Sequence, residues 1–175
     1  MDRPLSERVM PIAAMLFCLL GSPPTTWSVP IVNDPNGFED VSWGTILSET
    51  EHFVKVEDSG RVQTYERRGR PPSLGATPVD SIRFTTFERK FGRVTVRYSG
   101  KDTHDGILTY LQATYGPLDR TPGQIAVGPV KVYAWHGLLS EVTLRFESGI
   151  DRGIIFFESR TLPEKLADDT STTAF

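Results

Sequence analysis

The stretch Arg93–Pro117, RVTVRYSGKDTHDGILTYLQATYGP, changes its apolar spacing halfway along. Over RVTVRYS, apolar residues recur at every second position, as Val94, Val96 and Tyr98 do. Such alternation is typical of a strand that buries one face and exposes the other to water. The sequence therefore predicts a half-buried strand that leads directly into the element after it.

The second part of the stretch, Lys101–Pro117, predicts the clearest helix of the chain. Asp102 or Thr103 is suited to cap its start. Gly116 followed by Pro117 is a strong stop signal, because glycine accepts the left-handed conformation and proline cannot continue a helix. The apolar residues that share one helical face are Ile107, Leu108, Leu111 and Tyr115.

Five further segments have strand patterns separated by glycine-containing turns, which indicates antiparallel meanders. They are Arg61–Arg68, Asp80–Glu88, Pro129–His136, Glu141–Glu147 and Ile154–Ser159. The last is apolar on both faces, so we expect it to lie centrally or to be covered.

The segment Phe38–Phe53, FEDVSWGTILSETEHF, predicts a second, short helix that Thr45 would cap and that would carry Ile46, Leu47 and Thr50. The order of elements is then helix, three strands, helix, three strands, which indicates an internal duplication. We expect an α+β fold in which two helix-plus-three-strand (αβββ) units form antiparallel sheet with the helices on one face.

The first 28 residues are typical of a secretory leader. Basic residues at the start precede an uncharged apolar run, Val9–Leu20, that is too short to span a bilayer. The best cleavage point follows Ser28, because Thr26 and Ser28 are small residues at the third and first places before the cut. We expect a periplasmic or extracellular protein; the alternative is an uncleaved leader that tethers the chain to the membrane.

The rest of the chain reads as a lead-in at 29–37, a single α+β domain at 38–165 and a disordered tail at 166–175. Cys18, the one cysteine of the 175 residues, lies in the leader, so the mature chain is expected to have no disulfide and no thiol nucleophile. The net charge of −3 provides no attraction to nucleic acid.

Several short motifs occur in an order that resembles a group of uncharacterised exported bacterial proteins. They are Trp43-Gly44-Thr45, Tyr65, Phe84 and Phe87 before Gly92-Arg93, Tyr115-Gly116, and Tyr133-x-Trp135-x-Gly137. The resemblance covers Phe38 to about Leu162. It implies export and a single fold, and it transfers no activity.

No catalytic, phosphate-binding or metal-binding motif is present, and His52, His104 and His136 lie far apart in the sequence. We therefore expect no catalytic residues, no metal site and no cofactor. The one basic cluster is Arg67, Arg68 and Arg70, which is the preferred place for a partner surface.

These observations favour a non-enzymatic exported domain that binds a protein or cell-envelope component. One alternative is a small-ligand carrier whose cavity is lined by Trp43, Tyr115 and Trp135. Another is a hydrolase whose site is assembled from loops. Its candidate residues are His52, His104, Asp102, Asp105 and Glu141.

Overall fold

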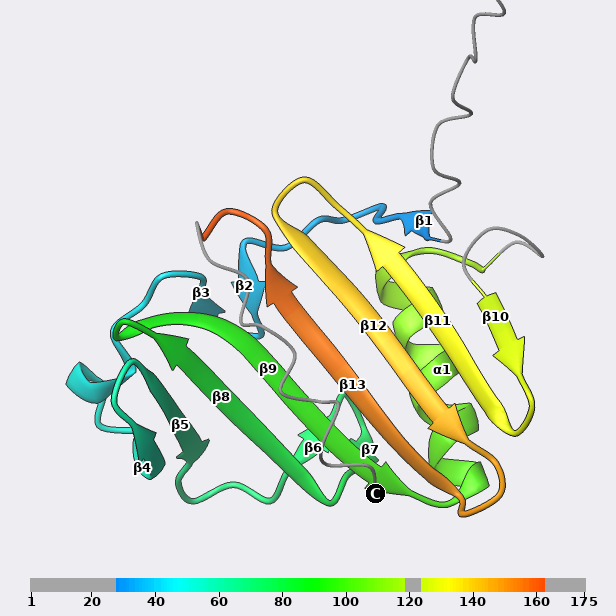
Figure 1. Ribbon diagram of the computed structural model, residues 1–175, viewed down its shortest axis with the longest axis horizontal. Coiled ribbons are helices and arrows are strands. Elements are labelled where there is room, and N and C mark those ends of the chain that lie inside the picture. Colours follow the sequence, from blue (N-terminus) through cyan, green and yellow to red (C-terminus); the bar gives the residue numbers. More distant parts are fainter. Residues whose placement is uncertain (1–27, 119–123, 163–175) are drawn as a thin grey trace, which may run out of the picture.

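The computed structural model describes residues 28–118 and 124–162, and the predicted leader up to residue 27 and the predicted tail at 166–175 lie outside these ranges. Figure 1 shows one broad, twisted sheet with a single α-helix behind it. Along the path of paired strands the order is β1-β11-β12-β13-β9-β8-β5-β4, and β10 also pairs with β11. All of these pairs are antiparallel except β1 with β11.

The strands of this sheet are β1 (Val29–Pro30), β4 (Phe53–Ser59), β5 (Val62–Arg67), β8 (Ser81–Phe87), β9 (Lys90–Ser99), β10 (Gln124–Val127), β11 (Val130–His136), β12 (Ser140–Glu147) and β13 (Arg152–Ser159). Two small hairpins pair β2 (Gly37–Phe38) with β3 (Val41–Ser42) and β6 (Ser73–Leu74) with β7 (Thr77–Pro78). The helices are α1 (Lys101–Tyr115) and a 3-10 turn, η1 (Leu47–Glu49).

Helix α1 carries the chain from the middle of the sheet to its far side. It follows β9, and the chain then returns through the meander β11-β12-β13 until β13 pairs with β9. This path places β13 between β12 and β9, which confirms that the segment expected to be central is central. All six segments predicted as strands, and the helix predicted over Lys101–Pro117, are present in the described structure. The predicted cap at Asp102 or Thr103 is wrong, because α1 already begins at Lys101 and Gly100 occupies the N-cap position.

One face of the sheet is covered by α1 and by the two small hairpins (Figure 1). The register places alternating residues of neighbouring strands together on this face, as with Val96 opposite Ile155 and Val94 opposite Phe157. Phe38 of the β2–β3 hairpin packs its ring 4.7 Å from that of Phe157, and Leu74 of the β6–β7 hairpin is fully buried. The core is therefore one layer between the sheet and these covering elements.

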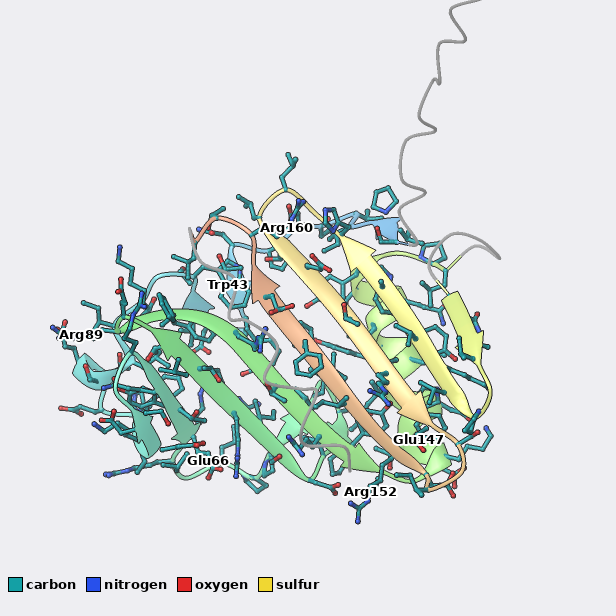
Figure 2. All side chains as sticks on the ribbon, in the orientation of Figure 1. Trp43, Glu66, Arg89, Glu147, Arg152 and Arg160 are labelled. Atoms are coloured by element: carbon teal, nitrogen blue, oxygen red, sulfur yellow. The ribbon has the colours of Figure 1, made fainter. Side chains whose placement is uncertain are left out.

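The opposite face of the sheet, here called the open face, carries the polar positions of the same strands. Thr95 and Arg97 on β9 lie beside Ile154 and Phe156 on β13, which are half-buried. Figure 2 shows charged side chains over this surface, with Glu147 and Arg152 at the β12–β13 turn. A sheet with one packed face and one wet face is typical of antiparallel architecture.

The expected pair of αβββ units is wrong, because the described residues form one large mixed sheet with a single α-helix. In the segment expected to form the first helix, the one helical element is the 3-10 turn η1. Ile46 is extended and bridges to Lys90, and the backbone of Thr45 accepts a hydrogen bond from Phe91 N–H. Because Thr45 and Ile46 pair with β9, they are not available to form the first turn of a full helix. The Thr45 hydroxyl donates to the Ser42 carbonyl instead of capping a helix.

The predicted lead-in, 29–37, is hydrogen-bonded into the sheet. Its strand β1 runs parallel to the end of β11, and Val32 N–H donates to the carbonyl of Tyr115. The Asp34 carboxylate accepts hydrogen bonds from the backbone N–H groups of Leu139 (2.7 Å) and Ser140 (3.0 Å). These contacts tie the lead-in to both α1 and the β11–β12 turn.

Within the described ranges, no helix combines the length and the apolarity that crossing a bilayer would require.

Candidate functional site

Arg67, the last residue of β5, is the centre of the candidate site. Its guanidinium donates to Glu39 Oε2 at 3.0 Å and to Asp40 Oδ1 at 2.6 Å, both from the β2–β3 turn. The same group lies over the rings of Phe53 and Phe84, at 5.3 and 5.6 Å from their centroids. Two acids and two aromatic faces therefore hold this side chain, which is 18% exposed, in one orientation.

The electrostatics around Arg67 leave one of its donors unused. The hydrogen bond from Arg67 is the main cause that lowers the pKa of Asp40, and the positive charge of Arg70 adds to it. Arg67 Nε is buried and has no hydrogen-bond partner within the part of the chain that the structure describes. Leaving a buried donor without an acceptor costs free energy, so an acceptor that hydrogen-bonded to this Nε would remove that cost.

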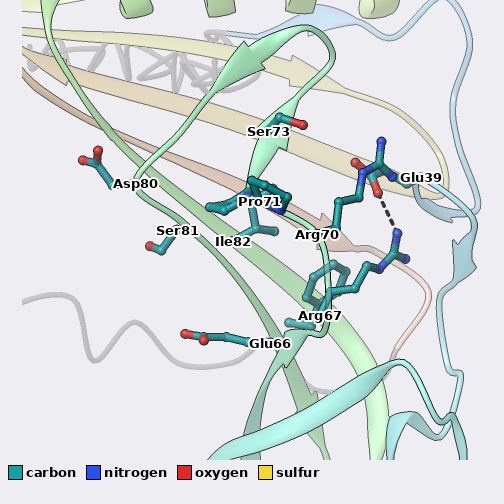
Figure 3. Close-up of a pocket in the computed structure, with 11 residues that line it drawn as sticks. Glu39, Glu66, Arg67, Arg70, Pro71, Ser73, Asp80, Ser81 and Ile82 are labelled. Carbon is teal, nitrogen blue, oxygen red and sulfur yellow. Dashed lines mark hydrogen bonds and ion pairs between the residues drawn. The ribbon is translucent and has the colours of Figure 1, made fainter.

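A first groove, with a volume of about 280 Å³, opens on one side of Arg67 (Figure 3). Its apolar lining includes Ile82, Phe84 and the rigid pair Pro71-Pro72. Arg67 and Arg70 contribute positive charge to it. Three acids, Glu39, Glu66 and Asp80, also line it. The first groove therefore combines apolar residues with charges of both signs, since Glu39 is ion-paired with Arg67 and Glu66 with Arg83.

A second groove, of about 360 Å³, adjoins the first, since Arg67 and Arg70 line both. It brings together all three arginines of the predicted basic cluster, Arg67, Arg68 and Arg70, with His52 beside them. The one acid in its lining is Asp40. Hydroxyl groups come from Ser42, Thr45 and Thr50.

The turn after β5 explains why Arg68 and Arg70 extend into solvent. Gly69 between them has φ of +73°, a left-handed conformation that favours glycine, and Pro71 then restricts the chain. Both arginines are exposed, and among the described residues neither guanidinium has a hydrogen-bond or ion-pair partner. Both groups can therefore meet an anion, although the charge of Arg70 already acts on Asp40.

The three aromatic residues proposed for a ligand cavity belong instead to the core. Trp43 is 8% exposed, Tyr115 7% and Trp135 0%. Both tryptophans donate their indole N–H within the protein: Trp43 to Ser140 Oγ at 2.8 Å, and Trp135 to the Gly116 carbonyl at 2.9 Å. None of the three lines either groove.

The residues considered for hydrolysis are dispersed. Of these, only His52 lines either groove. His104 is 3% exposed in the core, where its Nδ1 lies 2.7 Å from the Tyr98 hydroxyl and burial lowers its pKa to about 4. Asp105 is ion-paired with Lys101, an i,i+4 pair on the surface of α1.

Glu141 lies 3.5 Å from His136, away from both grooves. Across the described ranges, no group of three His, Cys, Asp or Glu side chains has a geometry that would hold a metal ion.

The partners of Arg67 were not found from the sequence. Glu39 and Asp40 precede it by 28 and 27 positions, and no local pattern joins two acids to a distant arginine. The signal that was present is the density of arginine in ERRGRPP, Glu66–Pro72.

Comparison with known proteins adds no family to this geometry. No family model, no curated protein and no solved structure matches the chain.

Proposed function

We propose that this protein is an exported, non-enzymatic domain that binds a protein or cell-envelope partner through Arg67, Arg68 and Arg70. One observation supports it most: the two grooves meet at Arg67 and Arg70, and two of the three guanidinium groups have no partner in the described structure. Arginine is enriched in protein interfaces, and a pre-oriented guanidinium loses little entropy on binding.

A binding role accounts for the geometry better than catalysis does. Two carboxylates and two aromatic rings hold the Arg67 guanidinium in one orientation, as a site that recognises a charged group requires. His52 is the one histidine in the linings of the two grooves, and in the described structure no lining serine or threonine hydroxyl is hydrogen-bonded to a histidine or carboxylate of these linings. General acid–base chemistry requires such groups within hydrogen-bond reach of each other.

The proposed location outside the cytoplasm rests on the leader pattern and on the resemblance to exported bacterial proteins. N-terminal sequencing of the protein recovered from the periplasm or medium is expected to start at Val29. Recovery of an uncleaved chain in the membrane fraction would support the tethered alternative. An uncleaved chain in the cytosol would contradict export.

Capture from a cell-envelope extract, using the mature domain as bait, tests the binding role. The informative variant is Arg68→Ala with Arg70→Ala, and we expect it to lose the captured partner. A matched control is Lys131→Ala with Arg152→Ala, two exposed basic residues of β11 and β13 that line neither groove and also have no hydrogen-bond or ion-pair partner in the described residues. Figure 2 shows Arg152 well apart from Glu66 of the first groove. Equal capture by both double variants would contradict the proposal.

A further inference from the structure

The two grooves differ in charge, and this difference bears on what they bind. In the second groove three arginines face one acid, Asp40. In the first groove two of those arginines face three acids. Positive potential is therefore concentrated in the second groove, while the first combines apolar residues with charges of both signs.

Building on the proposed function, we infer that the site binds an extended acidic peptide segment. The second groove holds one carboxylate of the segment, and the first groove holds a neighbouring apolar side chain. A carboxylate matches the planar fork of a guanidinium, with which it forms two parallel hydrogen bonds. Arg68 and Arg70 supply such forks without breaking an existing ion pair among the described residues.

The apolar side chain is assigned to the first groove because of its lining. Ile82, Phe84 and Pro71-Pro72 offer an apolar surface next to Arg67. Ile82 is only partly buried in the absence of a partner, so a side chain packed against it would remove apolar area from water. The position of Arg67 between the grooves sets the two contacts side by side.

A densely charged polyanion fits the same surface less well. In the first groove Glu39 is ion-paired with Arg67 and Glu66 with Arg83, so repeated phosphates or sulfates passing along it would compete with these ion pairs and would approach the Asp80 carboxylate. Like charges brought together at an interface disfavour a partner strongly. A segment with a single carboxylate beside an apolar residue avoids this repulsion.

Small peptide probes test the inference directly. The mature protein is titrated with N-acetyl-Leu-Glu-N-methylamide while the arginine Nε–Hε signals are followed by NMR. We expect saturable shifts of the signals of Arg68 and Arg70, with a dissociation constant of about 1 mM, the range of a fragment-sized ligand. The matched probe with Gln in place of Glu should bind at least tenfold more weakly. Replacing Leu by Ala should weaken binding several-fold.

Variants and a competing anion complete the test. The Arg68→Ala, Arg70→Ala double variant should show no saturable shift of any arginine signal with the Leu-Glu probe, and the Lys131→Ala, Arg152→Ala control should keep the shifts of Arg68 and Arg70. Inorganic phosphate that saturates at a lower concentration than the Leu-Glu probe would overturn the inference in favour of a phosphate-bearing envelope component. The absence of saturable shifts with the peptide would also overturn it.

These failures are distinguishable from a failure of the proposed function. If envelope capture depends on Arg68 and Arg70 but the Leu-Glu probe does not bind, the ligand class is wrong and the binding role stands. If capture does not depend on these arginines, the binding role itself is wrong.

Discussion

Substitution of Gly153 by alanine should destabilise this protein far more than an ordinary strand substitution. Gly153 of β13 lies directly opposite Tyr98 of β9, and the Tyr98 ring crosses over it so closely that an added Cβ would overlap the ring. Tyr98 is 1% exposed, and its hydroxyl is hydrogen-bonded to His104 Nδ1 at 2.7 Å. Its ring also lies parallel to that of Phe146, with centroids 6.4 Å apart.

The expected magnitude follows from three effects. Forcing a methyl group into a filled core costs about 1–3 kcal/mol. Displacing Tyr98 from His104 leaves a buried polar group unpaired, at a further cost of about 1–3 kcal/mol. Alanine restricts the unfolded chain more than glycine does, which offsets about 0.4–1 kcal/mol. The net expectation is a loss of about 1–5 kcal/mol in the free energy of unfolding, centred on about 3 kcal/mol.

Urea unfolding measures this loss, and Gly149→Ala is the matched control. At Gly149 the nearest atom to an added Cβ is Pro129 Cβ at 3.8 Å, an ordinary contact, so its stability should change by less than about 0.5 kcal/mol. In a Tyr98→Leu background the cost of Gly153→Ala should shrink, because the ring that it overlaps is gone. The reasoning would be refuted if Gly153→Ala unfolded at the same urea concentration as the wild-type protein. It would also be refuted if Gly153→Ala lowered the free energy of unfolding equally in the Tyr98→Leu background.

Three further outcomes are expected. Burial lowers the pKa of His104 in the folded protein from 6.5 to about 4, so as pH falls the unfolded chain is protonated at this residue before the folded one. The free energy of unfolding should therefore decrease between about pH 6.5 and about pH 4, by up to about 1.4 kcal/mol per pH unit. Thermal unfolding at stepped pH measures this dependence, and His104→Gln should remove it. Asp34→Ala should cost about 1–3 kcal/mol in urea unfolding, because the backbone N–H groups of Leu139 and Ser140 lose their acceptor; an unchanged midpoint would show that the lead-in is dispensable. Ser140→Ala should cost about 1–3 kcal/mol, since Trp43 Nε1 then lacks its partner, and a Trp43→Phe background should abolish most of that cost.

The elements that the sequence predicted correctly are those with a local period. Strand β9 alternates and α1 follows a spacing of three and four, so each pattern could be recognised without knowledge of its neighbours. The helix expected after Thr45 failed for the opposite reason. Its conformation is decided by the bridge from Ile46 to Lys90, a contact between residues distant in the chain.

The candidate site was partly visible for a similar reason. Arg67, Arg68 and Arg70 are contiguous enough to be noticed as a cluster. The acids Glu39 and Asp40, which orient Arg67, come from another hairpin and could not be assigned to it.

The same limit applies to the aromatic residues. A tryptophan in a strand such as Trp135 favours a core position, but a cavity stays an alternative until the covering element is known. In this structure the Trp135 indole N–H donates to the Gly116 carbonyl at the end of α1, so the indole is buried beneath the helix.

By itself, the sequence determined the period, and hence the type, of most strands and of α1, together with the place where positive charge gathers. These properties depend on neighbouring residues, whose side chains share a face through the geometry of one element. Only the tertiary structure decided that, within the described residues, one α-helix covers one continuous sheet, that the lead-in is part of this sheet, and that Arg67 lies between two grooves of different charge. Each of these depends on pairing between distant segments, where hydrogen bonds and burial override local preference.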